Sequence, residues 1–198
     1  MKTVVGFLSR AHGFDVLSSL IDSKEYTILR IYTHSLNPKT QDPTRSKRKD
    51  FDLFVKKCQS KNIDLIAIDS KEQKISDFPD CDYIVEVSWR YLIPEQLTRK
   101  AKIGAFGIHR GKLPDYAGTE PIKQAINKGE KEIILSSHYL EQIIDTGDVI
   151  CTRSHPINYN PQQSLEENIQ RLLDEITPFF SELVFKTFEI IEGKQKPH

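Results

Sequence analysis

The feature that most constrains the fold is the alternation of β-rich runs with helical stretches in the first half of the chain. Runs rich in β-branched and aromatic residues occur at 3–8, 27–34, 63–69 and 82–88. Segments in which apolar residues recur at helical spacing occur at 14–22 and 51–61. Strands that alternate with helices form βαβ units, which build a parallel, twisted sheet with flanking helices. The sequence therefore predicts an α/β fold of the Rossmann type.

The second half of the chain predicts an antiparallel extension of this sheet near residues 132–157. Two strand-like runs, 132–140 and 148–157, lie on either side of the turn sequence DTG. Such an arrangement is typical of a hairpin or near-hairpin. A further apolar run, GAFGIH, ends at His109 and is expected to form another strand. The sheet is therefore predicted to be mostly parallel, with its antiparallel part late in the chain.

Two helices are expected in the second half. The first covers residues 119–129, with Thr119 as its N-cap. The second covers residues 164–193. It opens with the capping-box sequence SLEE and is expected to be interrupted or kinked at Pro178. Apolar residues at helical spacing predict a stripe that packs in the core or forms a dimer face, and they are Phe179, Phe180, Val184 and Phe188.

Length and composition limit the classes of protein that this chain can be. Its 198 residues are enough for one domain, 1–198, with a core of its own. Lysine plus arginine and aspartate plus glutamate both number 28, so the zero net charge indicates neither a nucleic-acid nor a membrane partner. No apolar stretch approaches a membrane span and the N-terminus reads as a strand, so a cytoplasmic protein is expected. Three widely spaced cysteines indicate reduced thiols, and no cluster has metal-ligand spacing.

The residues that indicate chemistry are a histidine and an aspartate far apart in the chain. His109 ends an apolar run and precedes a loop rich in glycine and proline, and Asp145 opens the DTG turn. Taken singly, His109 is an ordinary core-edge histidine and Asp145 an ordinary turn residue. A carboxylate beside an imidazole favours the protonated ring and fixes its orientation. If the two side chains meet, the pair is suited to acid–base work on a reacting carbonyl.

The turn after the first strand, SRAHGF, is a second candidate site, because loops that follow parallel strands often bind ligands. It has a single glycine, so it matches neither the dinucleotide GxGxxG motif nor a P-loop. Arg10, His12 and backbone N–H groups can instead hold a substrate phosphate, and an ordinary strand-to-helix turn is the alternative. The basic run 45–49 is interpreted as a solvated face, with attraction of a diphosphate as its alternative.

Two segments resemble a known family. GAFGIHRGKLPDYAG resembles the loop of folate-dependent formyltransferases, in which an Asn-x-His pair precedes Leu-Pro-x-Tyr-x-Gly, and DTGDVI resembles their Asp-x-Gly turn. The spacing from His109 to Asp145 agrees, and His138 occupies a position where the family often has histidine. The resemblance covers most of residues 1–155. In MKTVV, IYTHSLNP and VSWRYLIP it is closest to the domain that acts on nucleotide-linked 4-amino sugars.

The resemblance implies transfer of a formyl group from 10-formyltetrahydrofolate to a primary amine, here of a nucleotide-linked amino sugar. It gives His109 the role of acid–base and oxyanion partner and gives Asp145 the role of orienting it. The folate is expected against the loop after the fourth strand and beside the DTG turn. For Trp89 and His138, packing in the core is the alternative to folate binding. The cofactor-binding residues would be Ser88, Trp89, Arg90, Tyr91, Leu92 and His138.

One position departs from the family pattern. Gly107 stands where the family has the asparagine that stabilises negative charge on the formyl oxygen. Loss of one such donor typically costs on the order of 10²–10³ in turnover. Either Arg110, Lys112 or His138 supplies another donor in an active enzyme, or the chain is a catalytically impaired binding protein.

The same residues leave other reactions and acceptors open. A hydrolase that releases formate from the same folate is a third reading. The zero net charge disfavours methionyl-tRNA as the acceptor. The absence of a Gly-Ser-Asn sequence in the first turn disfavours glycinamide ribonucleotide. A small-molecule amine is therefore the expected partner, and a homodimer stays open.

Overall fold

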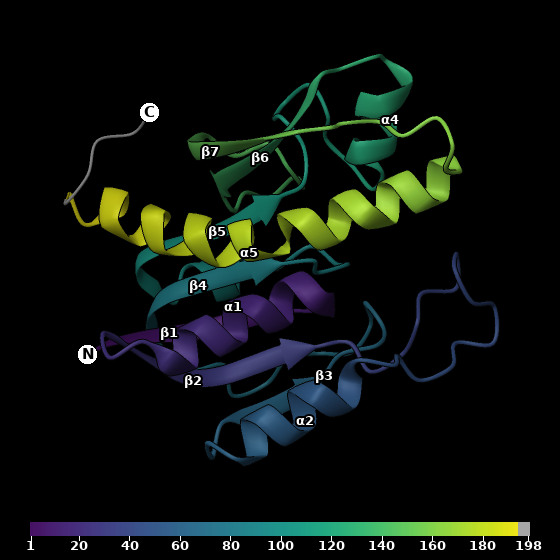
Figure 1. Cartoon of the computed structure of the whole chain (residues 1–198). Helices are drawn as coiled ribbons and strands as arrows, with labels where there is room; N and C mark the ends of the chain where they lie inside the picture. The colour runs from purple at the N-terminus through teal and green to yellow at the C-terminus, as the bar shows by residue number, and fades with distance from the viewer. Residues whose placement is uncertain (194–198) are drawn as a thin grey trace. The chain divides into compact units, whose positions relative to one another are not determined.

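The structure is a computed structural model that describes residues 1–193 (Figure 1). The chain forms two compact units, Met1–Ala105 and Phe106–His198. The strand that joins them, β5, begins in the first unit and ends in the second. That the chain acts as one domain stays a prediction. No helix in the described part of the chain is both long enough and apolar enough to cross a membrane.

Seven strands form one sheet, in the order β3-β2-β1-β4-β5-β6-β7. β1 pairs in parallel with β2 and β4, and β2 pairs in parallel with β3. β6 pairs antiparallel with both β5 and β7. The predicted α/β fold, with antiparallel strands at one end, is confirmed. The strands are β1 (Lys2–Leu8), β2 (Tyr26–Thr33), β3 (Asp64–Ala67), β4 (Cys81–Val87), β5 (Ala101–His109), β6 (Glu132–Tyr139) and β7 (Val149–Pro156).

The first unit is built around β1, which is central in its parallel part. Side chains of β1 and β4 are almost continuously buried, as expected for strands covered on both faces. The helix α1 (Arg10–Asp22) packs on β1, β2 and β4, and α2 (Phe51–Gln59) packs on β3 (Figure 1). A short helix, α3 (Glu95–Thr98), was not predicted.

The start of α1 corrects the sequence prediction, which placed it at residue 14. The helix begins at Arg10, directly after the extended residue Ser9. A Cβ atom at Gly13 would lie 2.9 Å from the backbone of Leu8, so glycine lets the first turn pack closely on the strand it leaves. Because of the same glycine, the segment 9–14 was predicted to be a turn.

The second unit contains the antiparallel strands and two helices, α4 (Pro121–Asn127) and α5 (Leu165–Ile191). The expected cap of α4 at Thr119 is wrong, because the N-cap is Glu120 and its side chain makes no capping bond. A proline in the first turn starts this helix, since its fixed φ suits that position and its missing N–H is not needed there.

The helix α5 covers the predicted range and has the predicted capping box, formed by Ser164 and Glu167. Of the two expected effects of Pro178, an interruption is wrong, because the helix continues through it, and a kink stays a prediction. A proline removes only one backbone donor, and buried residues on both sides of it hold the helix in place. Those residues include Leu172, Ile176, Phe180, Val184 and Phe188. The last three belong to the predicted core stripe and are buried as expected, whereas its fourth member, Phe179, is only partly buried.

All three cysteines, Cys58, Cys81 and Cys151, are free and buried. Burial raises the pKa of the Cys58 and Cys81 thiols to about 11. Thiols with such a pKa stay protonated and poorly reactive at neutral pH. The predicted reduced state agrees with their positions in the core.

The capping box gives the first testable prediction. Replacing Ser164 by Ala should lower the free energy of unfolding by about 1 kcal/mol, because the N–H of Glu167 loses its acceptor. Urea denaturation of the two proteins measures the difference. The matched control is Ser181→Ala within the same helix, whose hydroxyl bonds only to the Pro178 carbonyl and which should change stability by less than about 0.5 kcal/mol. Equal losses in both variants would contradict the role of the cap.

Candidate functional site

His109 is the last residue of β5, and its side chain is only 10% exposed. Its Nε2 atom lies 2.7 Å from the carbonyl oxygen of Tyr116. A carbonyl can only accept, so Nε2 carries the hydrogen and donates it. In the neutral ring this leaves a lone pair on Nδ1, which makes no hydrogen bond within the described residues. Nδ1 is therefore the nitrogen that can take up a proton.

Asp145 lies in the connection between β6 and β7 and faces two histidines. Its Oδ2 atom is 3.4 Å from Nδ1 of His109, and its Oδ1 atom is 3.7 Å from Nε2 of His138. The backbone N–H of Gly118 donates to Oδ2 at 3.1 Å. The structure thus brings together the histidine and aspartate that the sequence singled out, and it adds His138 to them.

The turn that carries Asp145 depends on Gly147. A Cβ atom at this position would lie 1.9 Å from the carbonyl oxygen of Tyr139, so only glycine fits. Asp145 itself has φ 59°, in the left-handed region that non-glycine residues seldom adopt. Such backbone is found where the surrounding structure fixes it, often at functional sites.

Burial sets the charge of both histidines. It lowers the pKa of His109 below the ordinary value, and the Asp145 carboxylate and the Tyr116 carbonyl only partly offset it. The same holds for His138, where burial outweighs Asp145. Both rings are therefore neutral near pH 7. This differs from the expectation that the carboxylate would favour a protonated ring, because the ring is more deeply buried than the sequence could show.

Gly107 lies two residues before His109 on β5, so both positions point to the same face of the strand. In the antiparallel register it stands directly opposite His138 on β6. Residues in such a pair have neighbouring side chains. At the position where the resemblance to formyltransferases led us to expect an asparagine, this chain therefore has the imidazole of His138 as the neighbouring polar group.

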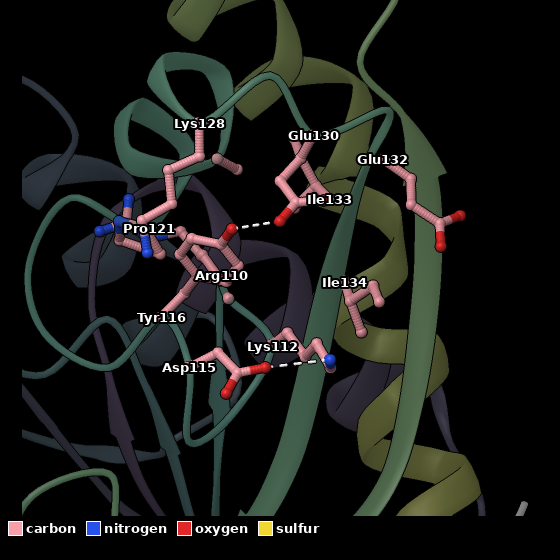
Figure 2. Close-up of a pocket in the computed structure, with 12 residues that line it drawn as sticks. Arg110, Lys112, Asp115, Tyr116, Pro121, Lys128, Glu130, Glu132, Ile133 and Ile134 are labelled. Atoms are coloured by element: carbon pink, nitrogen blue, oxygen red, sulfur yellow. Dashed lines mark hydrogen bonds and ion pairs between the residues drawn. The ribbon is translucent and has the colours of Figure 1, made fainter.

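The loop after β5, which contains Tyr116, is held in place by further contacts (Figure 2). The hydroxyl of Tyr116 donates to Glu130, and this bond raises the pKa of Tyr116 to about 12. Lys128 lies over the Tyr116 ring, 4.7 Å from its centroid. These groups line a cavity of 580 Å³ that also includes the ion pair of Lys112 and Asp115, at 2.9 Å. Because Tyr116 also supplies the carbonyl that holds His109, these contacts fix the imidazole.

The remaining predicted residues lie in the first unit. Trp89 stacks on His34, with ring centroids 4.1 Å apart, and the Tyr91 hydroxyl donates to the Asp69 carbonyl. Trp89, Tyr91 and Leu92 line a cavity of 360 Å³ together with apolar residues such as Ile68.

Ser88 and Arg90 do not line that cavity. Arg90 instead donates to the carbonyl of Leu36, in the loop after β2. The five predicted cofactor residues of this loop therefore divide into an apolar group and a polar group.

Arg10 and His12 occupy the first turn of α1, and His12 is buried. Arg10 donates to the side chain of Gln41 at 3.0 Å. In the basic run 45–49, Lys47 and Lys49 are exposed as predicted. Arg48, in contrast, is only 4% exposed. The interpretation of the run 45–49 as a wholly solvated face is therefore wrong at this residue.

Sequence reasoning missed His34. It follows β2 and is fully buried, with Nδ1 bonded to the Ile68 carbonyl and Nε2 accepting from the Arg90 N–H at 3.2 Å. Burial lowers the pKa of His34 to about 3. The only sequence signal for His34 was its place at the end of a predicted strand, and His109 has the same kind of place.

Comparison with known proteins now decides the family. The model of the formyl transferase family matches residues 12–183. The chain belongs to this family. Formyltransferases of this kind use 10-formyltetrahydrofolate as the formyl donor.

Curated relatives of this chain include methionyl-tRNA formyltransferases. That of Leptospira interrogans is 27% identical over 192 residues, which cover 94% of this chain and 58% of the relative. That of Staphylococcus aureus strain JH1 is 33% identical over 115 residues, which cover 58% of this chain and 35% of the relative. The chain thus spans little more than half the length of such relatives.

Several solved structures share the fold of this chain. Phosphoribosylglycinamide formyltransferase from Anaplasma phagocytophilum has a TM-score of 0.67 at 17% identity, covering 91% of this chain and 83% of that one. A sugar 3N-formyl transferase, WlaRD, described with dTDP and 5-N-formyl-THF, has a TM-score of 0.63 at 17% identity, covering 99% and 65%. A formyltetrahydrofolate deformylase from Pseudomonas syringae has a TM-score of 0.64 at 21% identity, covering 90% and 58%.

The electrostatics of the pair predict how His109 titrates. Replacing Asp145 by Asn should lower the pKa of His109 further, because the carboxylate that partly offsets burial is gone. An NMR titration of the histidine rings measures this shift. Asp148→Asn is the matched control, since that exposed aspartate lies in the same connection and should leave His109 unchanged. A pKa of His109 that stays constant or rises in Asp145→Asn would contradict the pairing.

The buried histidines also predict a loss of stability in mild acid. His34, His109 and His138 resist protonation when folded, whereas in the unfolded chain they bind protons near pH 6.5. Stability should therefore fall as pH drops below about 6.5, by up to about 1.4 kcal/mol per pH unit for each neutral ring. Urea denaturation at several pH values between 7.5 and 5 measures the slope. A His34→Gln variant should show a shallower slope, and an unchanged slope would count against His34.

Proposed function

We propose that the chain moves the formyl group of 10-formyltetrahydrofolate to the primary amine of a nucleotide-linked amino sugar. The observation that carries the proposal is the state of His109, a buried neutral imidazole with Nδ1 open and a carboxylate 3.4 Å away. Such a group can take a proton at neutral pH and hold the charge that follows. Membership of the formyl transferase family supports the reaction class.

His109 and Asp145 divide the work of proton transfer. The bound folate supplies an activated formyl carbon. As the acceptor amine attacks, Nδ1 of His109 takes up the amine proton, and the Tyr116 carbonyl keeps the ring in orientation. Asp145 then stabilises the imidazolium, because the attraction of opposite charges is strong in a buried place. His109 returns the proton to the leaving nitrogen, so the histidine and aspartate end as they began.

Trp89, Tyr91 and Leu92 would hold the ring system of the donor. They line a cavity of 360 Å³ in which aromatic and aliphatic side chains, which suit a flat heterocycle, lie beside polar ones such as Gln73 and Lys74. The Trp89 ring is already fixed by His34 and by an edge contact to Phe7, with centroids 5.0 Å apart. A fixed aromatic wall loses little entropy when a ligand stacks on it.

His138 is the group proposed to compensate for Gly107. It stands opposite that glycine in the sheet, and its Nε2 atom is buried without a hydrogen-bond partner in the described residues. An oxygen that becomes negative nearby raises the proton affinity of His138, and protonated Nε2 can then donate to it. The charge on Asp145, 3.7 Å away, favours the same protonation.

The acceptor class is supported by two observations. A sugar 3N-formyl transferase has the same fold over 99% of this chain. Arg10, at the end of β1, offers a cation where α/β sheets often bind phosphorylated ligands. The zero net charge of the chain agrees with a small acceptor better than with a nucleic acid. Methionyl-tRNA is the competing acceptor, since curated relatives carry that name.

A formyl-transfer assay with 10-formyltetrahydrofolate tests the proposal. The acceptors are a panel of nucleotide-linked amino sugars, with methionyl-tRNA and water as competitors. His109→Ala and Asp145→Ala should each lower kcat by about 10²-fold or more, because proton transfer loses its base or its stabilising charge. Asp148→Ala is the matched control and should keep the wild-type rate. Full activity in His109→Ala would refute the mechanism, and formate release without an acceptor would indicate a hydrolase.

Restoring the family amide tests the compensation by His138. In a His138→Gln background, Gly107→Asn should recover at least part of the lost rate, because one side-chain donor replaces another. In the wild-type background the same change should have little effect. A large gain in the wild-type background, with no loss from His138→Gln alone, would show instead an enzyme impaired by its glycine.

A further inference from the structure

Three arginines converge at one edge of the parallel strands in the first unit. Arg10 follows β1, Arg90 follows β4, and Arg48 reaches inward from the loop after β2. Arg48 donates to Ser9, next to Arg10, and to the His34 carbonyl at 2.8 Å. The backbone N–H of Arg90 donates to the ring of the same His34. The three segments that carry these arginines are therefore joined through Ser9 and His34.

These arginines are close enough to repel one another. The pKa of Arg10 is lowered, first by burial and then by the charge of Arg48. The pKa of Arg90 is lowered by burial and by the charges of both Arg10 and Arg48. Like charges gathered away from water destabilise a fold unless another group offsets them.

Carboxylates within the unit offset only part of this charge. Asp50 pairs with Arg48 through two bonds, of 2.9 Å and 2.6 Å. The Asp69 carboxylate is engaged by the backbone N–H groups of Ser35 and Leu36 and by the Ser35 hydroxyl. No carboxylate within the described residues forms an ion pair with Arg10 or Arg90 by direct contact.

Several donors of the cluster are also without an acceptor. The Nε and Nη1 atoms of Arg90 are buried and have no hydrogen-bond partner in the described residues, and the same is true of the Ser88 hydroxyl. Native proteins rarely leave buried donors unused, so unused donors call for an explanation. Donors that gather beside an excess of positive charge are arranged to receive an anion.

The position in the sheet agrees with a ligand site. From β1 the chain continues to β2 and β3 on one side, and β4 lies on the other side of β1. The N–H of Ser9 donates to the Val87 carbonyl at 3.0 Å, which ties the two strand ends together. Ligands of open α/β sheets bind outside the carboxyl ends of strands at such a reversal of strand order. Arg10 and Arg90 lie on its two sides.

We propose that Arg10, Arg48 and Arg90 bind the phosphate or diphosphate group of the acceptor. Identifying the ligand as the acceptor rests on the proposed function, whereas the anion site does not. Guanidinium groups match phosphate oxygens in charge and in paired geometry. A single carboxylate has two oxygens and one charge, for which one arginine is enough. Arg48 is buried and Arg10 and Arg90 are partly buried, so the cluster suits a compact phosphoryl group rather than the backbone of a nucleic acid.

Calorimetry of the full chain with inorganic pyrophosphate and inorganic phosphate tests this site, with glutamate as the carboxylate comparison. Wild-type protein should bind pyrophosphate more tightly than glutamate. Arg10→Gln and Arg90→Gln should each weaken pyrophosphate binding about tenfold or more, because each removes charge-assisted bonds. Arg99→Gln is the matched control, an exposed arginine of the same unit that pairs with Glu95, and should bind as wild type. Equal pyrophosphate affinity in all four proteins would overturn the proposal.

Thermal unfolding separates a binding role from a structural one. Without anion, Arg90→Gln should unfold at the same temperature as wild type or a higher one, because like-charge repulsion is removed. With pyrophosphate, wild type should be stabilised and Arg90→Gln much less so. A lower unfolding temperature in Arg90→Gln without anion, together with an unchanged response to pyrophosphate, would show that the arginine only supports the fold.

The two proposals can fail separately. Pyrophosphate binding that depends on Arg10 and Arg90, in a protein that transfers no formyl group, would support the anion site and refute the proposed function. Formyl transfer to a nucleotide-linked amino sugar, at a KM unchanged by Arg90→Gln and in a protein that binds no pyrophosphate, would do the opposite. Tighter binding of glutamate than of pyrophosphate would assign the cluster to a carboxylate and overturn the phosphoryl site.

Discussion

The candidate chemistry depends on one constraint, which is the close packing of the β6–β7 connection against the end of β6. The connection folds back so tightly that Gly147 touches the Tyr139 carbonyl and leaves no room for a side chain. The Tyr139 N–H donates to the Asp148 carbonyl at 3.1 Å and closes the connection on that strand. Between these contacts Asp145 is held with φ 59° and its carboxylate faces two imidazoles. A looser connection would leave an ordinary exposed aspartate.

Burial then decides what the aspartate and histidines can do. An exposed histidine beside a carboxylate would be mostly protonated and unable to accept a proton. In this protein burial lowers the pKa of His109 enough to keep its Nδ1 lone pair available, while Asp145 stays near enough to stabilise a positive ring. The hydrogen bond to Tyr116 fixes which nitrogen is open. Tyr116 is in turn held by Glu130 and Lys128, so contacts in the neighbouring cavity determine the geometry of the base (Figure 2).

The sequence predicted the elements of this fold better than their ends. Alternating apolar runs identified the parallel strands and the antiparallel pair, and the SLEE capping box correctly placed the start of α5. The start of α1 was misplaced because Gly13 serves close packing on Leu8, which local propensity does not report. Arg48 was misread for a similar reason. Its neighbours in the basic run are exposed, and only the tertiary contacts to Ser9 and His34 show that it is buried. Spacing could suggest that His109 and Asp145 pair. The open nitrogen of His109 follows instead from its hydrogen bond to Tyr116, and the place of His138 opposite Gly107 follows from the sheet register.

The loop after β4 shows how one strand end can serve two kinds of ligand chemistry. In this loop Trp89 and Tyr91 line the 360 Å³ cavity, whereas the side chain of Arg90 donates to the loop after β2. His34 supports both arrangements at once, because its ring stacks on Trp89 and its Nε2 atom accepts the Arg90 N–H. A charged imidazole could not accept that bond and would add to the positive charge of Arg48 and Arg90. The pKa of about 3 keeps His34 neutral, so a single buried ring can hold an aromatic wall and a cationic cluster side by side.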